Sequence, residues 1–168
     1  MSFFEKIFSK KNKNDSDNKE EIVLSPVDGK VIDLKNVNDP AFSEGILGDG
    51  LAIEPSSSQI VSPVDGVVSM LFDTCHAIGL SSESGVEILI HVGMDTVELN
   101  GEGFTSRVAS GQKIKKGDPL LEVDFDFIKS KGYDIVTPIV ITNMGQYKNI
   151  RKTDKTDILK GEELFHIS

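Results

Sequence analysis

The strongest pattern in the chain is a regular alternation of apolar and other residues between Gly85 and Val97. Successive side chains of a β-strand point to opposite faces, so the alternation predicts one strand with two different faces. The wholly apolar face carries Val86, Ile88, Ile90 and Val92. The opposite face carries Glu87, Leu89, His91 and Gly93. The pattern therefore predicts a stiff element that presents the imidazole of His91 outward.

Short apolar runs separated by glycine and proline continue from Ile22 to the end of the chain, and two of these units occur twice. Leu24-Ser-Pro-Val-Asp-Gly-Lys-Val31 returns as Val61-Ser-Pro-Val-Asp-Gly-Val-Val68, and 116–123 returns more loosely as 160–167. Asp-Gly and Lys-Gly turns before apolar runs are typical of connections between β-strands. The repetition predicts an all-β fold, an antiparallel β-sandwich with a duplicated β motif. One or two short helices are expected, near 126–131 and 145–150.

The first 21 residues differ from the rest, which predicts an N-terminal segment over 1–21 and one domain over 22–168. Four large apolar residues recur at helical spacing in this segment, namely Phe3, Phe4, Ile7 and Phe8. Ser2 and Glu5 form a capping box, and several lysines follow. Residues 12–21 are polar and are expected to be a flexible tether. The amphipathic part fits a helix in a membrane interface, a helix packed on the core or on a neighbour, or a frayed tail.

Composition narrows the class of protein. The net charge of −9 argues against nucleic acid, which requires clustered Lys and Arg. The single cysteine, Cys75, excludes an intrachain disulfide and fits a reducing cytosol. The chain contains no run of 18 apolar residues, so we expect nothing that spans a membrane.

A second histidine supports a site at His91. Phe72, Thr74 and His76 share one strand parity, and 79–85 is expected to be a turn. His76 and His91 then lie on adjacent antiparallel strands, where paired Cβ atoms are about 4.5–5.5 Å apart. Two adjacent imidazoles suit phosphoryl transfer or metal binding. The third histidine, His166, is expected to face solvent and receives no chemical role.

The run Gly85-x-x-Ile88-Leu89-Ile90-His91-Val92-Gly93-Met94-x-Thr96-Val97 resembles the signature of the glucose-type enzyme IIA family of the bacterial sugar phosphotransferase system. The similarity extends to both Ser-Pro-Val-Asp-Gly segments, to Thr74-x-His76-Ala77 and to Thr137-Pro-x-Val-Ile-x-Asn-Met144. The resemblance implies a duplicated hybrid-motif sandwich and a phosphohistidine relay. It implies that His91 accepts the phosphoryl group, that the Gly93 carbonyl fixes its tautomer, and that His76, oriented by Thr74, donates to the phosphoryl oxygens.

The same resemblance implies partners and a docking surface. The phosphoryl group would come from the histidine phosphocarrier protein and pass to a cysteine on the IIB domain of a sugar permease. The docking surface would carry Asp39, Phe42, Leu47, Phe72, Leu89 and Asp95, although core packing is an equal alternative for Phe42 and Phe72. Free-standing members carry an amphipathic N-terminal segment, which favours an anionic membrane surface as the partner of residues 1–13. The protein would be cytoplasmic and at times membrane-associated.

Other classes of function remain open at this stage. A zinc hydrolase of a related sandwich fold would need a His-x-His pair, which the chain lacks, and two histidines fall short of three zinc ligands. A zinc ion held by His76 and His91 together with a partner's carboxylate is the metal site that these residues allow. A regulatory module that binds permeases or metabolic enzymes when unphosphorylated is compatible with the relay. No cofactor is expected to be required, and no Walker-type phosphate loop is present.

Overall fold

The computed structural model describes residues 20–168. The predicted N-terminal segment lies almost entirely outside these residues. The described chain is dominated by short strands, with few helical turns. The strands are β1 (Glu21–Leu24), β2 (Gly29–Ile32), β3 (Asp49–Pro55), β4 (Gln59–Val61), β5 (Gly66–Leu71), β6 (Ala77–Ser82), β7 (Glu87–His91), β8 (Phe104–Ser106), β9 (Lys113–Ile114), β10 (Pro119–Val123), β11 (Thr137–Ile141), β12 (Ile150–Lys152), β13 (Asp157–Ile158) and β14 (Glu163–Ile167). The helical elements are η1 (Leu34–Asn36), α2 (Pro40–Ser43), η2 (Thr96–Leu99), α3 (Phe125–Ser130) and η3 (Met144–Gln146).

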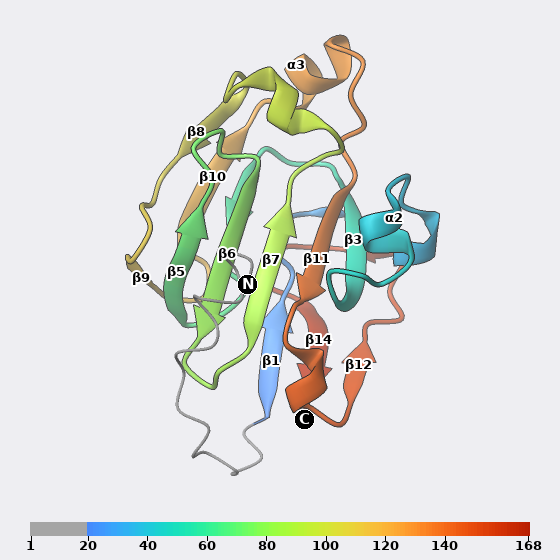
Figure 1. Ribbon diagram of the computed structural model, residues 1–168, viewed down its shortest axis with the longest axis vertical. Helices are drawn as coiled ribbons and strands as arrows, with labels where there is room; N and C mark the ends of the chain where they lie inside the picture. The colour runs from blue at the N-terminus through green and yellow to red at the C-terminus, as the bar shows by residue number, and fades with distance from the viewer. Residues whose placement is uncertain (1–19) are drawn as a thin grey trace.

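The strands form three sheets, and every strand pair in them is antiparallel. The large sheet has the order β13-β2-β3-β11-β7-β6-β5-β9, and its central strands face the viewer in Figure 1. The two small sheets, β1-β14-β12 and β4-β10-β8, supply the opposing layer. Apolar side chains from all three sheets, including Ile90, Leu121 and Phe165, meet in one core. The expected antiparallel β-sandwich is therefore confirmed.

The duplication predicted from the repeats is visible in the hydrogen bonds. The Leu24 N–H donates to the Pro63 carbonyl, and the Val61 N–H donates to the Pro26 carbonyl, so the two copies bind each other reciprocally. Within each copy the serine hydroxyl donates to the backbone two residues on, Ser25 to Val27 and Ser62 to Val64. Each aspartate accepts a backbone N–H from the paired lysine turn, Asp28 from Lys160 and Asp65 from Lys116. The two copies thus make equivalent sets of hydrogen bonds, which hold the sandwich together.

One local prediction is wrong, and another holds only in part. Residues 79–82 belong to β6, and the turn is confined to the residues between β6 and β7. The small residues Gly79, Ser81 and Ser82 that suggested a turn instead pair as strand residues with β5 and β7. The segment near 145–150 contains only the short η3 and the start of β12. The helix expected at 126–131 is confirmed as α3, with the Asp124 side chain accepting the Phe127 N–H.

Among residues 20–168, no helix has the length and apolar character needed to cross a membrane. His166 lies on β14, half-buried, where Arg151 contacts its Nδ1 at 2.9 Å and Glu20 contacts its Nε2 at 3.1 Å. Arg151 can only donate, so Nδ1 accepts and Nε2 carries the proton given to Glu20. His166 therefore holds the start of the described chain against β14, and its side chain is less open to solvent than expected.

Candidate functional site

His91 is the last residue of β7, and the backbone that follows fixes its imidazole. The ring Nδ1 lies 2.8 Å from the carbonyl oxygen of Gly93. A carbonyl can only accept, so Nδ1 carries the proton and Nε2 keeps its lone pair. Gly93 has a φ of 74°, and a Cβ there would lie 2.6 Å from a methyl carbon of Thr96. Glycine is therefore needed at the position that sets the tautomer of His91.

His76 immediately precedes β6 and is reached through a tight turn. Leu71 ends β5, and the Cys75 N–H donates to the Phe72 carbonyl. Cys75 adopts the left-handed conformation, with a φ of 56°. The turn brings the Thr74 hydroxyl to 2.5 Å from Nδ1 of His76. The predicted grouping of Phe72, Thr74 and His76 is present, but a turn rather than a shared strand face produces it.

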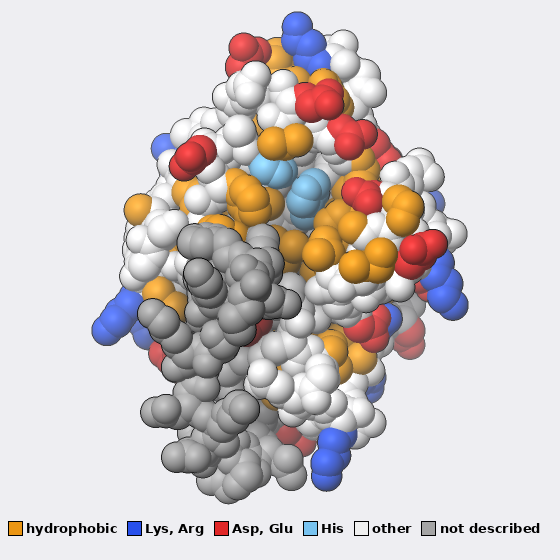
Figure 2. All heavy atoms as spheres, in the orientation of Figure 1, with side chains coloured by type: hydrophobic (Ala, Val, Ile, Leu, Met, Phe, Trp, Pro, Cys, Tyr) orange, Lys and Arg blue, Asp and Glu red, His pale blue; other side chains and the backbone are white. Residues whose placement is uncertain are grey.

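The two histidines lie together, with ring centroids 5.2 Å apart and ring planes nearly perpendicular at 82°. The strand register pairs His91 with Ala77, so His76 lies one residue beyond its expected position opposite His91. The Val92 N–H donates to the His76 carbonyl at 2.7 Å, which extends the ladder to this point. In Figure 2 the two imidazoles sit side by side at an open surface.

Both imidazoles are held in the neutral form. Burial, with a smaller contribution from the charge of His91, lowers the pKa of His76 to about 4. Burial also lowers the pKa of His91, although the hydrogen bond to Gly93 and the charges of Asp39 and Asp95 oppose this shift. At neutral pH each ring therefore carries one proton and one free nitrogen lone pair.

The site is walled by aromatic and aliphatic side chains. The ring of Phe42 lies 5.2 Å from that of His91, and the ring of Phe72 lies 5.2 Å from that of His76. Phe42 is only 2% exposed and belongs to a second apolar cluster with Leu34, Ala77, Leu89 and Val140. For Phe42 the core-packing alternative therefore holds, and Phe72 packs at the edge of this cluster.

The outward face of β7 is more covered than the alternation predicts. Leu89 is buried because η1, α2 and Phe72 pack over it, so it is not an exposed docking residue. Glu87 is also buried, and its carboxylate accepts the hydroxyl proton of Ser81 on the neighbouring strand. His91, at the end of the strand, is the one residue of this face that keeps partial exposure.

The exposed rim of the site combines apolar and acidic residues. Leu47, which was predicted to be a docking residue, is 38% exposed. Ile46, 69% exposed, and Val97, 48% exposed, were not singled out from the sequence. Asp39 caps α2 by accepting the Ala41 N–H, and Asp95 adopts the left-handed conformation before η2. Figure 2 shows this mixture of apolar and acidic side chains around the histidines.

The residues described do not build a complete metal site, since no group of three His, Cys, Asp or Glu side chains converges anywhere within 20–168. The histidine pair would supply two ligands only, and catalytic zinc takes three from the protein. A zinc ion completed by a partner's carboxylate thus stays a prediction.

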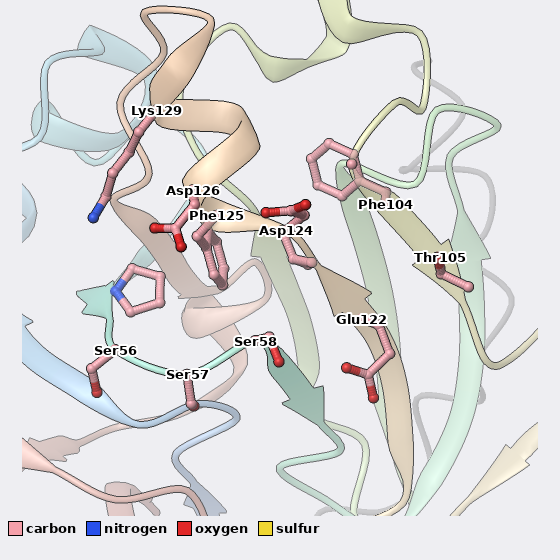
Figure 3. A pocket seen from close by; sticks show the side chains of 13 residues that line it. Ser56, Ser57, Ser58, Phe104, Thr105, Glu122, Asp124, Phe125, Asp126 and Lys129 are labelled. Carbon is pink, nitrogen blue, oxygen red and sulfur yellow. The ribbon is translucent and has the colours of Figure 1, made fainter.

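A cleft of about 710 Å³ lies elsewhere on the molecule. Serines 56–58, residues 103–105, β10 and the start of α3 line it, as Figure 3 shows. It contains no histidine, and none of the residues that surround the histidine pair contributes to it. The histidine pair instead lies at the open surface that Figure 2 shows, which suits the approach of another macromolecule more than the enclosure of a small substrate.

Comparison with known proteins places this arrangement in a family. The family described as the phosphoenolpyruvate-dependent sugar phosphotransferase system, EIIA 1, matches residues 21–147. The chain is 44% identical over 156 residues to the PTS system glucose-specific EIIA component of Buchnera aphidicola, covering 93% of this chain and 92% of that protein. The structure resembles the glucose permease IIA from Mycoplasma capricolum with a TM-score of 0.84 and 41% identity, covering 89% of this chain and 96% of that one.

Multidomain relatives also match. The chain is 45% identical over 150 residues to the PTS system beta-glucoside-specific EIIBCA component of Halalkalibacterium halodurans. That alignment covers 89% of this chain, but the chain spans only 23% of the length of that relative. The family match extends over most of the chain, and the glucose-specific relative is covered almost completely. The chain therefore belongs to the EIIA 1 family of the phosphoenolpyruvate-dependent sugar phosphotransferase system.

Proposed function

We propose that this protein is a phosphocarrier of the sugar phosphotransferase system and that Nε2 of His91 carries the phosphoryl group. The observation that supports this most strongly is the contact between Nδ1 and the Gly93 carbonyl, which leaves Nε2 unprotonated. A neutral imidazole with a free nitrogen, on a residue that is partly exposed, is a competent nucleophile at neutral pH.

Each transfer moves one phosphoryl group between two nucleophiles. The Nε2 lone pair of His91 attacks phosphorus on the phosphohistidine of the histidine phosphocarrier protein, and the old P–N bond breaks with its electron pair returning to that imidazole. In the second step a cysteine thiolate of the permease IIB domain attacks the same phosphorus, and the P–Nε2 bond breaks. The proton on Nδ1 stays with His91 in both steps, held by Gly93.

His76 stabilises the transferred group in this proposal. The Thr74 hydroxyl lies 2.5 Å from Nδ1 of His76, and in this proposal it is the donor, which leaves the proton of the neutral ring on Nε2. That N–H is available to the phosphoryl oxygens, whose charge approaches about −2 at neutral pH. Because the pKa of His76 is about 4, the ring donates as a neutral group and does not trap the phosphate as a cation would.

The exposed rim is the proposed docking surface for both partners. Ile46, Leu47 and Val97 provide apolar contact, and Asp39 and Asp95 steer basic groups toward His91. Phe42 and Leu89 support this surface from below. Relatives whose name joins EIIB, EIIC and EIIA in one chain are consistent with a IIB domain as the acceptor. Attachment of phosphate would add charge to an apolar surface, so regulatory targets would bind the unphosphorylated form. We place the transfer in the cytoplasm.

The experiment is a reconstituted relay containing labelled phosphoenolpyruvate, the first enzyme of the system and the phosphocarrier protein. We expect an acid-labile label that His91→Ala abolishes. We expect His76→Gln to accept the label and to fail in passing it to a IIB domain. Retention of label in His91→Ala, or normal onward transfer by His76→Gln, would refute this assignment.

A further inference from the structure

The hydrogen bond between His91 and Gly93 depends on a loop whose position has to be fixed by other groups. β7 ends at His91, so the Gly93 carbonyl is presented by loop backbone and not by a strand. The φ of 74° at Gly93 shows that the chain turns sharply there. Hydrogen bonds weaken steeply as they bend, so a modest rotation of this carbonyl would release Nδ1 of His91. The groups that hold the two peptide groups on either side of Gly93 therefore bear on the tautomer.

The peptide group on the C-terminal side of Gly93 is held from β11. β7 and β11 are antiparallel neighbours, so the end of one strand lies beside the start of the other (Figure 1). The Met94 N–H donates to the carbonyl of Asp134 at 2.9 Å. This N–H and the Gly93 carbonyl belong to one planar peptide group. The bond to Asp134 therefore restricts the rotation of the carbonyl that accepts from His91, and it also polarises that carbonyl as an acceptor.

The peptide group on the N-terminal side of Gly93 is held by Thr96, the first residue of η2. The Thr96 hydroxyl donates to the Val92 carbonyl at 2.5 Å, which closes the loop from Val92 to Thr96 around the glycine. The Thr96 methyl group packs beside Gly93, since a Cβ built on that glycine would lie 2.6 Å from it. Thr96 thus holds the loop by a hydrogen bond and by contact.

This hydrogen bond is made away from water. Both Thr96 and Val92 are 0% exposed. Removal of the hydroxyl would take a donor from a buried carbonyl, which costs more than the loss of a bond at the surface. We expect the backbone at Val92 to move toward another donor, and this movement would turn the next peptide group, which carries the Gly93 carbonyl, away from His91.

We propose that Thr96 is a positioning residue for phosphoryl transfer, whose hydroxyl holds the Gly93 carbonyl against Nδ1 of His91 and so keeps Nε2 unprotonated. Thr96 acts through the backbone of Val92 and Gly93 and is not a catalytic residue. The effect on transfer rests on the proposed function, whereas the effect on the tautomer does not.

The test compares Thr96→Ala with Thr96→Ser in the full-length protein, because these two variants differ only by the hydroxyl. Nitrogen-15 shifts of the His91 ring at pH 7.5, measured without phosphate or partners, report which nitrogen carries the proton. We expect the wild type and Thr96→Ser to keep it on Nδ1. In Thr96→Ala the ratio of this tautomer to the other should fall about two- to tenfold, the size expected for the loss of one hydrogen bond. The rate at which His91 accepts label from the phosphocarrier protein should fall with it and recover in Thr96→Ser.

Ser62→Ala controls for a general loss of stability. Ser62 is also buried, and its hydroxyl also donates to a backbone carbonyl, that of Val64, in the repeated segment between β4 and β5. This variant should be less stable than the wild type and leave the His91 shifts unchanged. Thr96→Val, which keeps the bulk of the side chain and lacks the hydroxyl, takes the place of Thr96→Ala if that variant does not fold.

A tautomer ratio equal to that of the wild type in the variant without the hydroxyl would overturn the proposal. An equal change in Thr96→Ser or in Ser62→Ala would also overturn it, because the hydroxyl of Thr96 would then have no specific effect. A changed tautomer with an unchanged rate of acceptance would refute the role in transfer. If the wild type itself accepts no label on His91, the proposed function fails, and the tautomer measurement still decides whether Thr96 holds the Gly93 carbonyl.

Discussion

The neutral state of His76 has a measurable consequence for stability below neutral pH. Burial lowers the pKa of His76 from 6.5 to about 4 in the folded protein, whereas the unfolded chain titrates near 6.5. Between these two pKa values His76 is protonated in the unfolded state and neutral in the folded state. Stability contributed by neutral His76 is therefore complete above pH 6.5 and is lost as the pH falls toward 4.

The magnitude follows from the two pKa values. The full shift corresponds to about 3 kcal/mol, of which about 2.5 kcal/mol is lost between pH 7.5 and pH 4.5. His76→Gln removes the titrating group. The variant should therefore lose about 2.5 kcal/mol less of its unfolding free energy over this interval than the wild type does. The carboxylates are common to both proteins, so their contribution cancels in the comparison.

The assay is urea unfolding of both proteins at pH 7.5 and pH 4.5, with the free energy extrapolated to water. A proton NMR titration of the imidazole gives the midpoint of His76 independently. A midpoint near 6.5, together with equal pH dependence of the two proteins, would show that the ring is not shielded from water and would refute the reasoning.

Three further changes test the framework of the site. Gly93→Ala places a side chain at a φ of 74° and against Thr96, so we expect thermal unfolding to show a loss of at least about 1–2 kcal/mol; an unchanged melting temperature would contradict the backbone argument. Phe42→Ala removes a buried ring that contacts His91, and denaturant titration should show a loss of about 3–5 kcal/mol, whereas a loss below about 1 kcal/mol would place this ring at the surface. Cys75→Val should be less stable than Cys75→Asn by about 1–2 kcal/mol, because a β-branched residue resists the left-handed conformation; equal stability would mean that the turn relaxes.

Much of the fold could be predicted from the sequence because the repeated segments make equivalent hydrogen bonds. Each Ser-Pro-Val-Asp-Gly copy needs a serine for its own turn and an aspartate to accept the lysine turn, so the repetition in sequence is a repetition of hydrogen bonds. The prediction of a turn over all of 79–85 was wrong because small residues also suit a central strand that is closely packed between its neighbours. Gly79 pairs with Met70 and Leu89 inside the sheet, and the Ser69 hydroxyl leaves little room there for a side chain.

At the site, the proximity of His76 and His91 was more predictable than the burial of the residues around them. The alternation of β7 correctly separated the core face from the face of His91, but alternation cannot tell whether another element covers the second face. The segment from η1 to α2 provides that cover, which is why Phe42 and Leu89 are buried. The pair Asp39-Pro40 was an available signal for α2, because aspartate caps helices and proline suits their first position. The left-handed turn at Cys75 left no such signal, since cysteine has no preference for that conformation.

The central claim concerns one atom, Nε2 of His91, and nitrogen-15 NMR of the phosphorylated protein tests it directly. With the side chain of His91 labelled, the phosphorus coupling should appear on Nε2, while Nδ1 keeps the proton that it donates to Gly93. Coupling to Nδ1, or a phosphoryl group found on His76, would contradict the account.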